Sequence, residues 1–371
     1  MKYFNNILIY RIGHLGDTLV SLPAFWAIRK YYPDAHLTLL TNSNANNPNY
    51  ILAQNVLPKE DLFDDWLIYP SELGKLQSLL TFSKLFLEIR RRKFDALFYL
   101  TTRNRTVEQI KRDAWFFRSA GIKNIIGTEY LLKNLLDTNV SRPLPFIESE
   151  KDFLINCLRF EHIQIKDTGN LKPDLRLVEN EIYEAEKWLE ENCGKYLQTN
   201  KLLAVAPSGK WKSKIWSEDS FAEVVQNLIE KADVFPIVFG GAEDKEKGNR
   251  LIGQWKTGAN AAGTLNIRQA AAALSKCRIY LGNDTGTMHL AASVGVPCVA
   301  IFSAIDWAGR WIPFGENHRI FRETVPCEGC LSSVCKFQHE CMKAIKTDEV
   351  FAQCLSLWKD SVNMQSGRNI N

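Results

Sequence analysis

The chain has 371 residues, of which 46% are hydrophobic and 24% charged, an ordinary globular composition long enough for two domains. A formal net charge of +4 is too small for a typical nucleic-acid-binding protein, so we expect no nucleic acid partner. The N-terminus does not resemble a signal peptide, because Arg11 and His14 interrupt a short apolar run. No apolar run approaches the roughly 20 residues that cross a bilayer, and we expect a cytoplasmic protein.

Short apolar runs alternate with stretches of helical spacing along the first half of the chain, which is typical of parallel strands joined by helices. In chain order we predict a strand at 6–10, a helix at 16–32, a strand at 36–41, a loop at 42–49, a helix at 73–92, and strands at 96–100 and 125–126. Helices at 153–160 and 181–191 lie in a less regular region, and we expect the connection between two domains near 165–180.

The second half repeats the alternation and ends in a polar stretch, 361–371, that we expect to be a frayed tail. We predict strands at 202–206, 235–239, 279–282 and 298–302, and helices at 221–229, 267–274 and 289–294. Two tandem alternations predict an α/β protein with two Rossmann-like, doubly wound domains that face each other across a cleft.

Three loops that follow predicted strands carry candidate chemistry, because ligands of doubly wound sheets bind beyond the carboxyl ends of the strands. The first loop runs from Arg11 to Asp17, and its Gly13 and Gly16 allow close backbone approach. Asp17 falls in the first turn of the next helix, where the helix dipole favours a carboxylate. The alternative is an ordinary first-turn acid, since Gly-x-x-Gly is not the dinucleotide fingerprint.

The second loop follows the strand at 202–206 and contains Ser208, Gly209, Lys210 and Lys214. Backbone N–H groups and lysine ammonium groups at a strand end suit a diphosphate, and the alternative is a solvated basic loop. Trp216 precedes the next helix and is expected to act as its hydrophobic staple.

The third loop follows the strand at 279–282 and opens a helix whose first amides and hydroxyls can bind an anion. Its candidate ligands are Asp284, Thr285, Gly286, Thr287 and His289. A single histidine on a helix is more often structural, so His289 has that alternative.

Together these loops resemble the motifs of glycosyltransferase family 9, the ADP-heptose:lipopolysaccharide heptosyltransferases, over nearly the whole chain. The first motif is matched by Arg11, Leu15, Gly16, Asp17 and Pro23. Pro207, Lys214 and Trp216 match the second, while Ser208 stands where the family has glycine. The family's Gly-Gly-x-x-Glu turn appears at 240–244, and its Asp-Thr-Gly-x-x-His-Leu-Ala-Ala signature is intact at 284–292.

The resemblance implies a GT-B fold, with an acceptor-binding domain at 1–175 and a nucleotide-sugar-binding domain at 176–371. It implies an inverting transfer from an ADP-sugar without a catalytic metal or other cofactor, in agreement with the absence of any Asp-x-Asp from the sequence. Asp17 would be the general base, and Lys210 and Lys214 would neutralise the leaving diphosphate. Glu243 or Asp244 would hold the ribose, and Leu265 would lie against adenine.

The acceptor side departs from the best-known members at Gly13-His14, where those carry Ser-Ser. The default acceptor is a lipopolysaccharide core, with other surface glycans or a protein as alternatives. Arg103 and Arg105 follow the strand at 96–100 and are candidates, with Gly13 and His14, for binding an anionic acceptor. The basic run 90–93 is a candidate for peripheral contact with phosphates of the inner membrane, against the ordinary interpretation of a solvated helix end.

Four of the nine cysteines lie close together near the C-terminus: Cys327, Cys330, Cys335 and Cys341. Such a set can close a structural zinc or iron site, and the alternative is a reduced, metal-free loop. Two functions of other classes also fit the architecture. A sugar-nucleotide epimerase would turn over the nucleotide-sugar without an acceptor, and a non-catalytic nucleotide-sugar-binding protein would tolerate Asp17→Ala.

Overall fold

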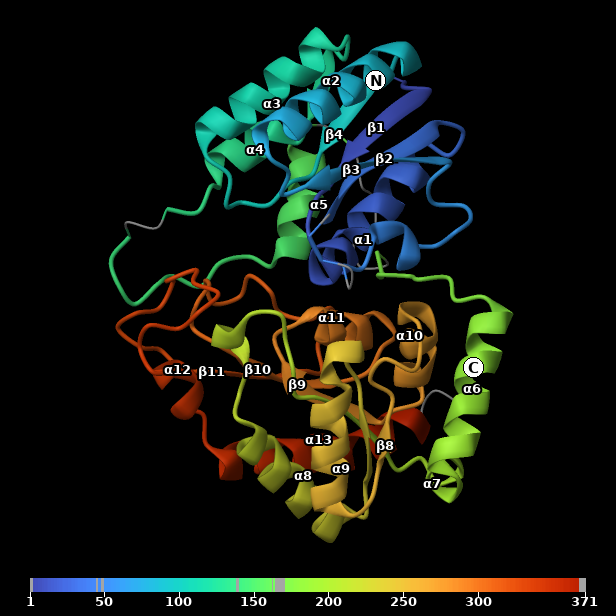
Figure 1. Ribbon diagram of the computed structural model, residues 1–371, viewed down its shortest axis with the longest axis vertical. Helices are drawn as coiled ribbons and strands as arrows, with labels where there is room; N and C mark the ends of the chain where they lie inside the picture. Colours follow the sequence, from blue (N-terminus) through green and yellow to red (C-terminus); the bar gives the residue numbers. More distant parts are fainter. Residues whose placement is uncertain are drawn as a thin grey trace. The chain divides into compact units, whose positions relative to one another are not determined.

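The computed structural model describes residues 3–44, 46–47, 50–137, 140–161, 163 and 171–366, which fall into two compact units (Figure 1). The first unit comprises Met1–Asn139 and Glu148–Leu175, and the second comprises Val140–Ile147 and Arg176–Asn371. The segment Val140–Ile147 therefore belongs to the second unit, although the predicted domain 1–175 contains it. The backbone explains this placement, because the Ile147 N–H donates to the Ala308 carbonyl at 3.0 Å.

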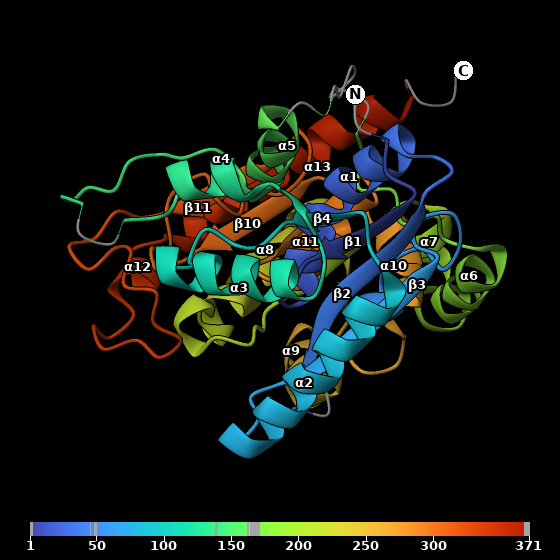
Figure 2. The ribbon, with the colours of Figure 1, turned by 90° about the horizontal axis from the view of Figure 1, so that it is seen from above.

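The first unit is a five-stranded parallel sheet in the order β3-β2-β1-β4-β5. Its strands are β1 (Asn6–Tyr10), β2 (His36–Asn44), β3 (Asp65–Ser71), β4 (Ala96–Tyr99) and β5 (Asn124–Ile126). Its helices are α1 (Leu15–Tyr31), α2 (Lys75–Arg92), α3 (Val107–Ser119), α4 (Thr128–Lys133) and α5 (Glu150–Phe160), with a 3-10 turn at Ala53–Asn55. Since parallel connections are right-handed, α1 covers one face of the sheet and α2 and α3 cover the other (Figure 2).

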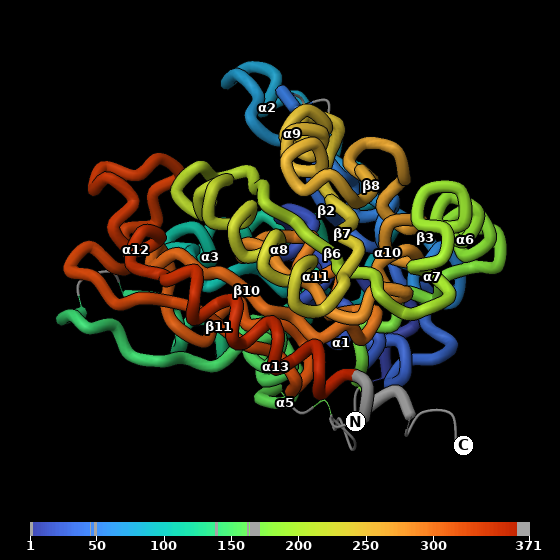
Figure 3. Tube along the Cα trace, turned by 90° about the horizontal axis from the view of Figure 1, so that it is seen from below, coloured from blue at the N-terminus to red at the C-terminus, as the bar shows by residue number. Residues whose placement is uncertain are grey.

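The second unit is a six-stranded parallel sheet in the order β11-β10-β9-β6-β7-β8. Figure 3 labels β11, β10, β6, β7 and β8 of this sheet in that order. Its strands are β6 (Leu202–Ala206), β7 (Phe235–Val238), β8 (Ala259–Asn260), β9 (Ile279–Asn283), β10 (Cys298–Phe302) and β11 (Arg319–Arg322). Its helices are α6 (Glu179–Cys193), α7 (Lys195–Gln198), α8 (Glu218–Ala232), α9 (Lys245–Trp255), α10 (Ile267–Ser275), α11 (Gly286–Ser293), α12 (Glu340–Lys343) and α13 (Thr347–Ser366), with 3-10 turns at Lys212–Lys214 and Ala242–Asp244. Helix α13 packs against α8, and α6 packs against α10.

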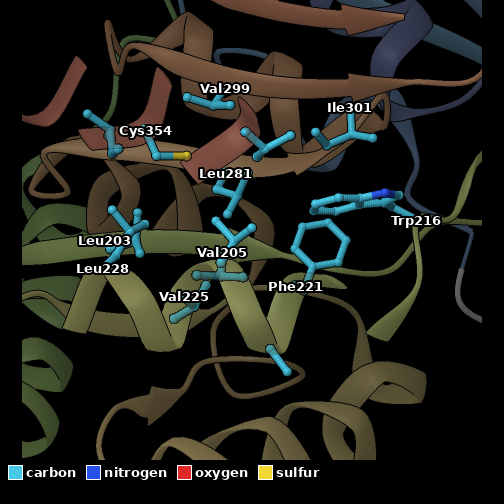
Figure 4. Packing of buried hydrophobic residues seen from close by; sticks show 14 of the residues in the cluster. Leu203, Val205, Trp216, Phe221, Val225, Leu228, Leu281, Val299, Ile301 and Cys354 are labelled. Atoms are coloured by element: carbon cyan, nitrogen blue, oxygen red, sulfur yellow. The ribbon is translucent and has the colours of Figure 1, made fainter. Parts of the chain in front are cut away.

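Aliphatic and aromatic side chains from β6, β9, β10, α8 and α13 form the core of the second unit (Figure 4). Trp216 lies just before α8, and Phe221 lies in the first turns of that helix. The two rings meet edge-on, with centroids 5.2 Å apart. Ser217 caps this helix, because its Oγ accepts a hydrogen bond from the Ser220 N–H at 3.0 Å. The predicted hydrophobic staple is thus confirmed, and it fixes where the loop after β6 ends.

The apolar runs predicted as strands and the fold class are confirmed, and the differences have physical causes. The edge strand β3 escaped prediction because it contains Pro70, which is tolerated at an edge. The polar tail predicted at 361–371 is wrong for 361–366, which continue α13; residues 367–371 lie outside the described residues. Ser361 is buried and accepts a hydrogen bond from the Arg278 guanidinium at 2.8 Å. Over the described ranges, no helix is long and apolar enough to span a membrane.

His318 links β10 to the segment before β11 through both ring nitrogens. Its Nδ1 accepts the Cys298 N–H at 3.0 Å, and its Nε2 lies 2.7 Å from the Phe314 carbonyl. Only the neutral imidazole can accept on one nitrogen and donate from the other. Burial lowers the pKa of His318 below its ordinary value of 6.5; the Phe314 carbonyl opposes this change, and Arg319 adds to it.

We expect the stability of the second unit to fall as the pH drops below 6.5. The pKa of His318 is lower in the folded state than in the unfolded state. The stability that His318 contributes to folding is therefore complete above the unfolded pKa and is lost as the pH falls toward the folded pKa. Urea unfolding from pH 8 to pH 5.5 should show this loss, and His318→Asn should reduce it. The control His36→Asn, at an exposed position that opens β2, should keep the wild-type profile; equal profiles for all three proteins would contradict the assignment.

Candidate functional site

In each unit the chain adds strands first on one side of its first strand and then on the other. The predicted motifs lie at this switch point in the strand order. In the first unit β1 pairs with both β2 and β4, and in the second β6 pairs with both β7 and β9. The loops that leave the carboxyl ends of neighbouring strands diverge at such a point and create a binding site. The loop after β1 leads into α1, whose first turn carries Asp17, and the loops after β6 and β9 carry Lys214 and Asp284.

Asp17 is held by its own loop at the N-terminus of α1. Its Oδ2 accepts the His14 N–H at 2.8 Å, and its Oδ1 lies 3.5 Å from the Arg11 guanidinium. The backbone at Gly13 has φ +138°, and a Cβ there would lie 2.4 Å from the Asp17 side chain, so this position requires glycine. The carboxylate remains 19% exposed and can meet a substrate hydroxyl.

Tyr50 covers the loop that carries Asp17. Its hydroxyl donates to the Gly13 carbonyl, and its ring contacts the His14 ring edge-on with centroids 5.2 Å apart. Burial raises the pKa of Tyr50 to about 12; the hydrogen bond to Asn42 opposes this change, while the carboxylates of Asp17 and Glu72 add to it. The phenol therefore stays protonated at neutral pH and holds the loop through its O–H.

A fully buried carboxylate, Glu150, lies behind this loop between two arginines. Its Oε2 accepts the Arg103 Nε–H at 3.3 Å, and its Oε1 lies 3.9 Å from the Arg11 guanidinium. Arg11 also donates to the carbonyls of Leu100 at 3.0 Å and Asp17 at 3.2 Å. The arginine that faces Asp17 is thus fixed by a buried ion pair that sequence reasoning missed.

The two arginines predicted to meet an anionic acceptor have different surroundings. Arg103 is only 3% exposed, and besides its pair with Glu150 it donates to the Glu148 carbonyl and lies over the Phe153 ring. Its position is that of a structural residue, which does not support the predicted acceptor contact. Arg105 is 14% exposed and pairs with Asp113 at 2.9 Å.

In the second unit the structure brings Lys214 and Asp284 together. The Lys214 Nζ lies 2.6 Å from the Asp284 Oδ2, and the two side chains are 18% and 6% exposed. An ammonium group has three donors, so the pair with Asp284 orients Lys214 and leaves donors for a further oxygen ligand. Lys210 is exposed in the same loop.

Asn283, which the sequence analysis missed, joins the loops of Lys214 and Asp284. Its Oδ1 accepts the Trp216 N–H at 3.0 Å, and its Nδ2 donates to the Ser208 carbonyl at 3.4 Å. Gly209 lies so close to the start of α11 that a Cβ would be 2.9 Å from the Thr285 methyl carbon. The buried amide and the glycine together hold the two loops side by side.

Three hydroxyls at the carboxyl edge of this sheet are buried and have no hydrogen-bond partner among the described residues. They belong to Ser208, after β6, Thr285, after β9, and Ser303, after β10. A buried polar group without a partner costs free energy, about 1–3 kcal/mol, and a bound water or ligand can supply the missing partner. Gly286 and Thr287 begin α11 beside them and are half-buried.

A second ion pair follows β10 and borders the Lys214 loop. The Arg310 guanidinium lies 3.1 Å from the Asp306 carboxylate, which also accepts the Trp311 indole N–H at 2.8 Å. Burial raises the pKa of Asp306, but Arg310, Trp311, the Trp307 N–H and Lys214 outweigh it and leave the pKa below its usual value. His289 is 6% exposed, and its ring lies 6.3 Å from that of Trp311.

The remaining predicted donor residues lie on two loops that touch each other. The Gly263 N–H donates to the Gly240 carbonyl at 3.2 Å, which brings the turn of Leu265 beside the turn of Glu243 and Asp244. Asp244 uses its carboxylate within the turn, since it accepts the Gly241 N–H at 3.0 Å. Glu243 is exposed and Leu265 is half-buried. Ribose binding by Glu243 or Asp244 stays a prediction.

The cysteine-rich segment 327–341 packs beside the Lys214 loop, because Ser213 donates to the carbonyls of Ser332 at 2.6 Å and Ser333 at 3.2 Å. Burial and the neighbouring thiols raise the pKa values of Cys327 and Cys341. Within the described ranges, however, no three His, Cys, Asp or Glu side chains are arranged as metal ligands. Metal binding by Cys327, Cys330, Cys335 and Cys341 stays a prediction.

We expect Glu150→Gln to destabilise the first unit by about 3 kcal/mol or more, because it leaves two buried guanidinium groups without their carboxylate. Glu88→Gln is a matched control, since Glu88 also forms ion pairs with two arginines, Arg91 and Arg92, but on the surface. Chemical unfolding of both variants checks this expectation. A Glu150 variant no less stable than the Glu88 variant would contradict it.

Residues 83–340 match the family described as glycosyltransferase family 9 (heptosyltransferase). Lipooligosaccharide heptosyltransferase 2 of Campylobacter jejuni is 24% identical over 373 residues, covering 96% of this chain and 99% of that protein. A family 9 glycosyl transferase from Veillonella parvula has a TM-score of 0.71 at 19% identity, covering 96% of this chain and 98% of that one. E. coli ADP-heptose lipopolysaccharide heptosyltransferase II has a TM-score of 0.62 at 19% identity, covering 96% and 99%. These likenesses confirm the predicted GT-B fold, and because the family match spans more than half of the chain, the protein belongs to glycosyltransferase family 9 and is a glycosyltransferase.

Proposed function

We propose that the protein transfers heptose from ADP-heptose to a hydroxyl of a lipopolysaccharide-core or related surface-glycan acceptor, with inversion and without a catalytic metal. The observation that carries the proposal is the pairing of Lys214 with Asp284 at the switch point of the second sheet. The names of the relatives supply the sugar, since they include an ADP-heptose heptosyltransferase from E. coli. Membership of family 9 favours transfer over the epimerase and non-catalytic alternatives.

The second unit offers the groups that a nucleotide diphosphate needs. Lys214 supplies a positive charge, the start of α11 supplies amides, and the buried hydroxyls of Ser208 and Ser303 supply donors. Glu243 would bind the ribose hydroxyls, and Leu265 would contact adenine. As the bond to the sugar breaks, its electrons pass to the diphosphate, and the groups around Lys214 stabilise the added negative charge.

Asp17 of the first unit would act as the general base. It takes the proton of the acceptor hydroxyl while that oxygen forms its bond to the anomeric carbon, on the face opposite to the departing diphosphate. Attack on the opposite face inverts the configuration. Gly13 and His14 lie in the same loop, and Arg105 lies beyond β4, so these residues are the candidates for orienting the acceptor. An acceptor anchored in lipid would bring the enzyme to the cytoplasmic face of the inner membrane as a peripheral protein.

We expect ADP and ADP-heptose to raise the melting temperature, whereas UDP- and GDP-sugars do not. Lys214→Ala should weaken ADP binding by about 1.5–3 kcal/mol, or roughly 10- to 100-fold, because a charge-assisted hydrogen bond is lost. The control Lys231→Ala changes an exposed lysine of α8. Since Lys214→Ala leaves Asp284 buried without its partner, the double variant Lys214→Ala/Asp284→Asn separates lost binding from lost folding. Stabilisation by UDP-sugars alone would contradict the assigned donor.

We expect Asp17→Asn to lower kcat by roughly 10²–10⁴-fold, the range of general-base catalysis, with little change in ADP binding. Asp219→Asn, which removes an acid from the first turn of α8, is the matched control for an ordinary first-turn carboxylate. Transfer by the wild type should persist in excess EDTA. Equal effects of the two substitutions would show that Asp17 is only a helix-terminal acid, and inhibition by EDTA would contradict metal independence.

A further inference from the structure

Helix α2 of the first unit turns a stripe of leucines to solvent. The inward side of the helix includes Ile89, which is fully buried. The outward side carries four leucines that are between 55% and 71% exposed: Leu76, Leu79, Leu80 and Leu87. Their spacing of three, one and seven residues places them on one helical face. Ser83 and Arg90 lie on the same face, so the stripe is not purely apolar. Four leucines this exposed on one helix still indicate a binding surface.

Basic side chains border this stripe on both sides. At 100° per residue, Lys75 flanks the leucines on one side, and Lys84 and Arg91 flank them on the other. Arg90 falls between Leu79 and Leu76, and all four basic residues are exposed. The helix has five basic residues against one acid, Glu88, which gives it a net charge of +4. That value equals the formal net charge of the whole chain, so the remaining residues are neutral in sum.

Helix α3 extends the same surface. It packs beside α2 through the Phe86 and Phe116 rings, whose centroids are 5.7 Å apart (Figure 1, Figure 2). Its Trp115 is 70% exposed. Three exposed basic residues share this helix with Trp115: Lys111, Arg112 and Arg118. The exposed sides of the two helices form what we call the α2–α3 surface.

We propose that the α2–α3 surface binds the interface of an anionic lipid bilayer. Leucines that enter the boundary of acyl chains and headgroups, basic groups that meet lipid phosphates and an exposed tryptophan are the chemistry of interfacial helices. A second copy of the chain is a poorer partner, because two surfaces of the same positive charge repel each other. This inference rests on the peripheral membrane location in the proposed function and deepens it by naming the surface, but its test requires neither donor nor acceptor.

Helix α2 begins at the same edge of the sheet as the loop that leads to Asp17. Strand β3 ends at Ser71 and α2 begins at Lys75, so the first turns of α2 lie at the carboxyl edge of the sheet. The loop of Asp17 leaves β1 at the same edge, because the strands are parallel. Three of the four leucines, Leu76, Leu79 and Leu80, occupy these first turns. Bilayer binding through α2 would bring this edge toward the lipid headgroups.

The test is sedimentation of the full chain with vesicles that contain no glycan acceptor. We expect binding to vesicles of phosphatidylglycerol and phosphatidylethanolamine, weakening as salt rises, and little binding to phosphatidylcholine. Replacing the four leucines with Gln, or Lys84, Arg90 and Arg91 with Gln, should each lower binding about tenfold or more. The control replaces Ile182 and Tyr183, exposed apolar residues of α6, with Gln and should bind like the wild type.

Retained helicity and unchanged stabilisation by ADP would show that the variants are folded, and they keep this test separate from that of the proposed function. No binding by the wild type, or equal binding by the leucine variant, would overturn the proposal. Sedimentation velocity tests the alternative partner, a second copy of the chain. A wild-type dimer that the leucine substitutions dissociate, together with no vesicle binding, would overturn the bilayer proposal in favour of a self-interface.

Discussion

The buried ion pairs of Glu150 are the interaction on which the first unit's site depends. Burying a carboxylate and two guanidinium groups is costly, and removing one member afterwards is more costly still, because the others remain in a region of low dielectric constant. Helix α5 supplies Glu150, the end of β1 supplies Arg11, and the segment after β4 supplies Arg103. Three segments distant in sequence are thereby held around the arginine that faces Asp17.

In the second unit an uncharged side chain holds the loops of the site together. A single amide, that of Asn283, joins both ends of the loop after β6 to the end of β9. Two ion pairs lie beside this amide, one between Lys214 and Asp284 and the other between Arg310 and Asp306. Both pairs combine one positive and one negative group, so the site can bind an anion without a large excess of buried charge.

Much of the fold could be predicted from the sequence, because strands buried on both faces are continuous apolar runs. Helix α3 escaped, although Thr106 and Gln109 form the capping box that could have revealed it. The motif residues were predictable as well, because they directly follow predicted strands. The burial of individual side chains was not predictable. Arg103 and Arg105 look alike in sequence, but Arg103 pairs with the buried Glu150, whereas Arg105 pairs with Asp113.

Asn283, Asp306 and Arg310 were missed for a related reason. Each lies in or after a predicted strand, but none belongs to a motif, and their roles come from contacts with residues far away in sequence. The position of a residue at a strand end is readable from the sequence. Which of the polar groups at that end hold the loops, and which remain for a ligand, depends on distances that only the folded chain has.

The segment Val140–Ile147 makes the chain pass between its units three times rather than once. Its Leu144 N–H donates to the Glu328 carboxylate, which is only 1% exposed. A C-terminal fragment that begins at residue 176 would therefore lack the segment Val140–Ile147 of its own unit. The Glu328 carboxylate would then lose the hydrogen bond from the Leu144 N–H. Gene fusion, truncation or exchange of halves between relatives would have to carry this short segment along with the C-terminal half, even though it is encoded within the N-terminal half.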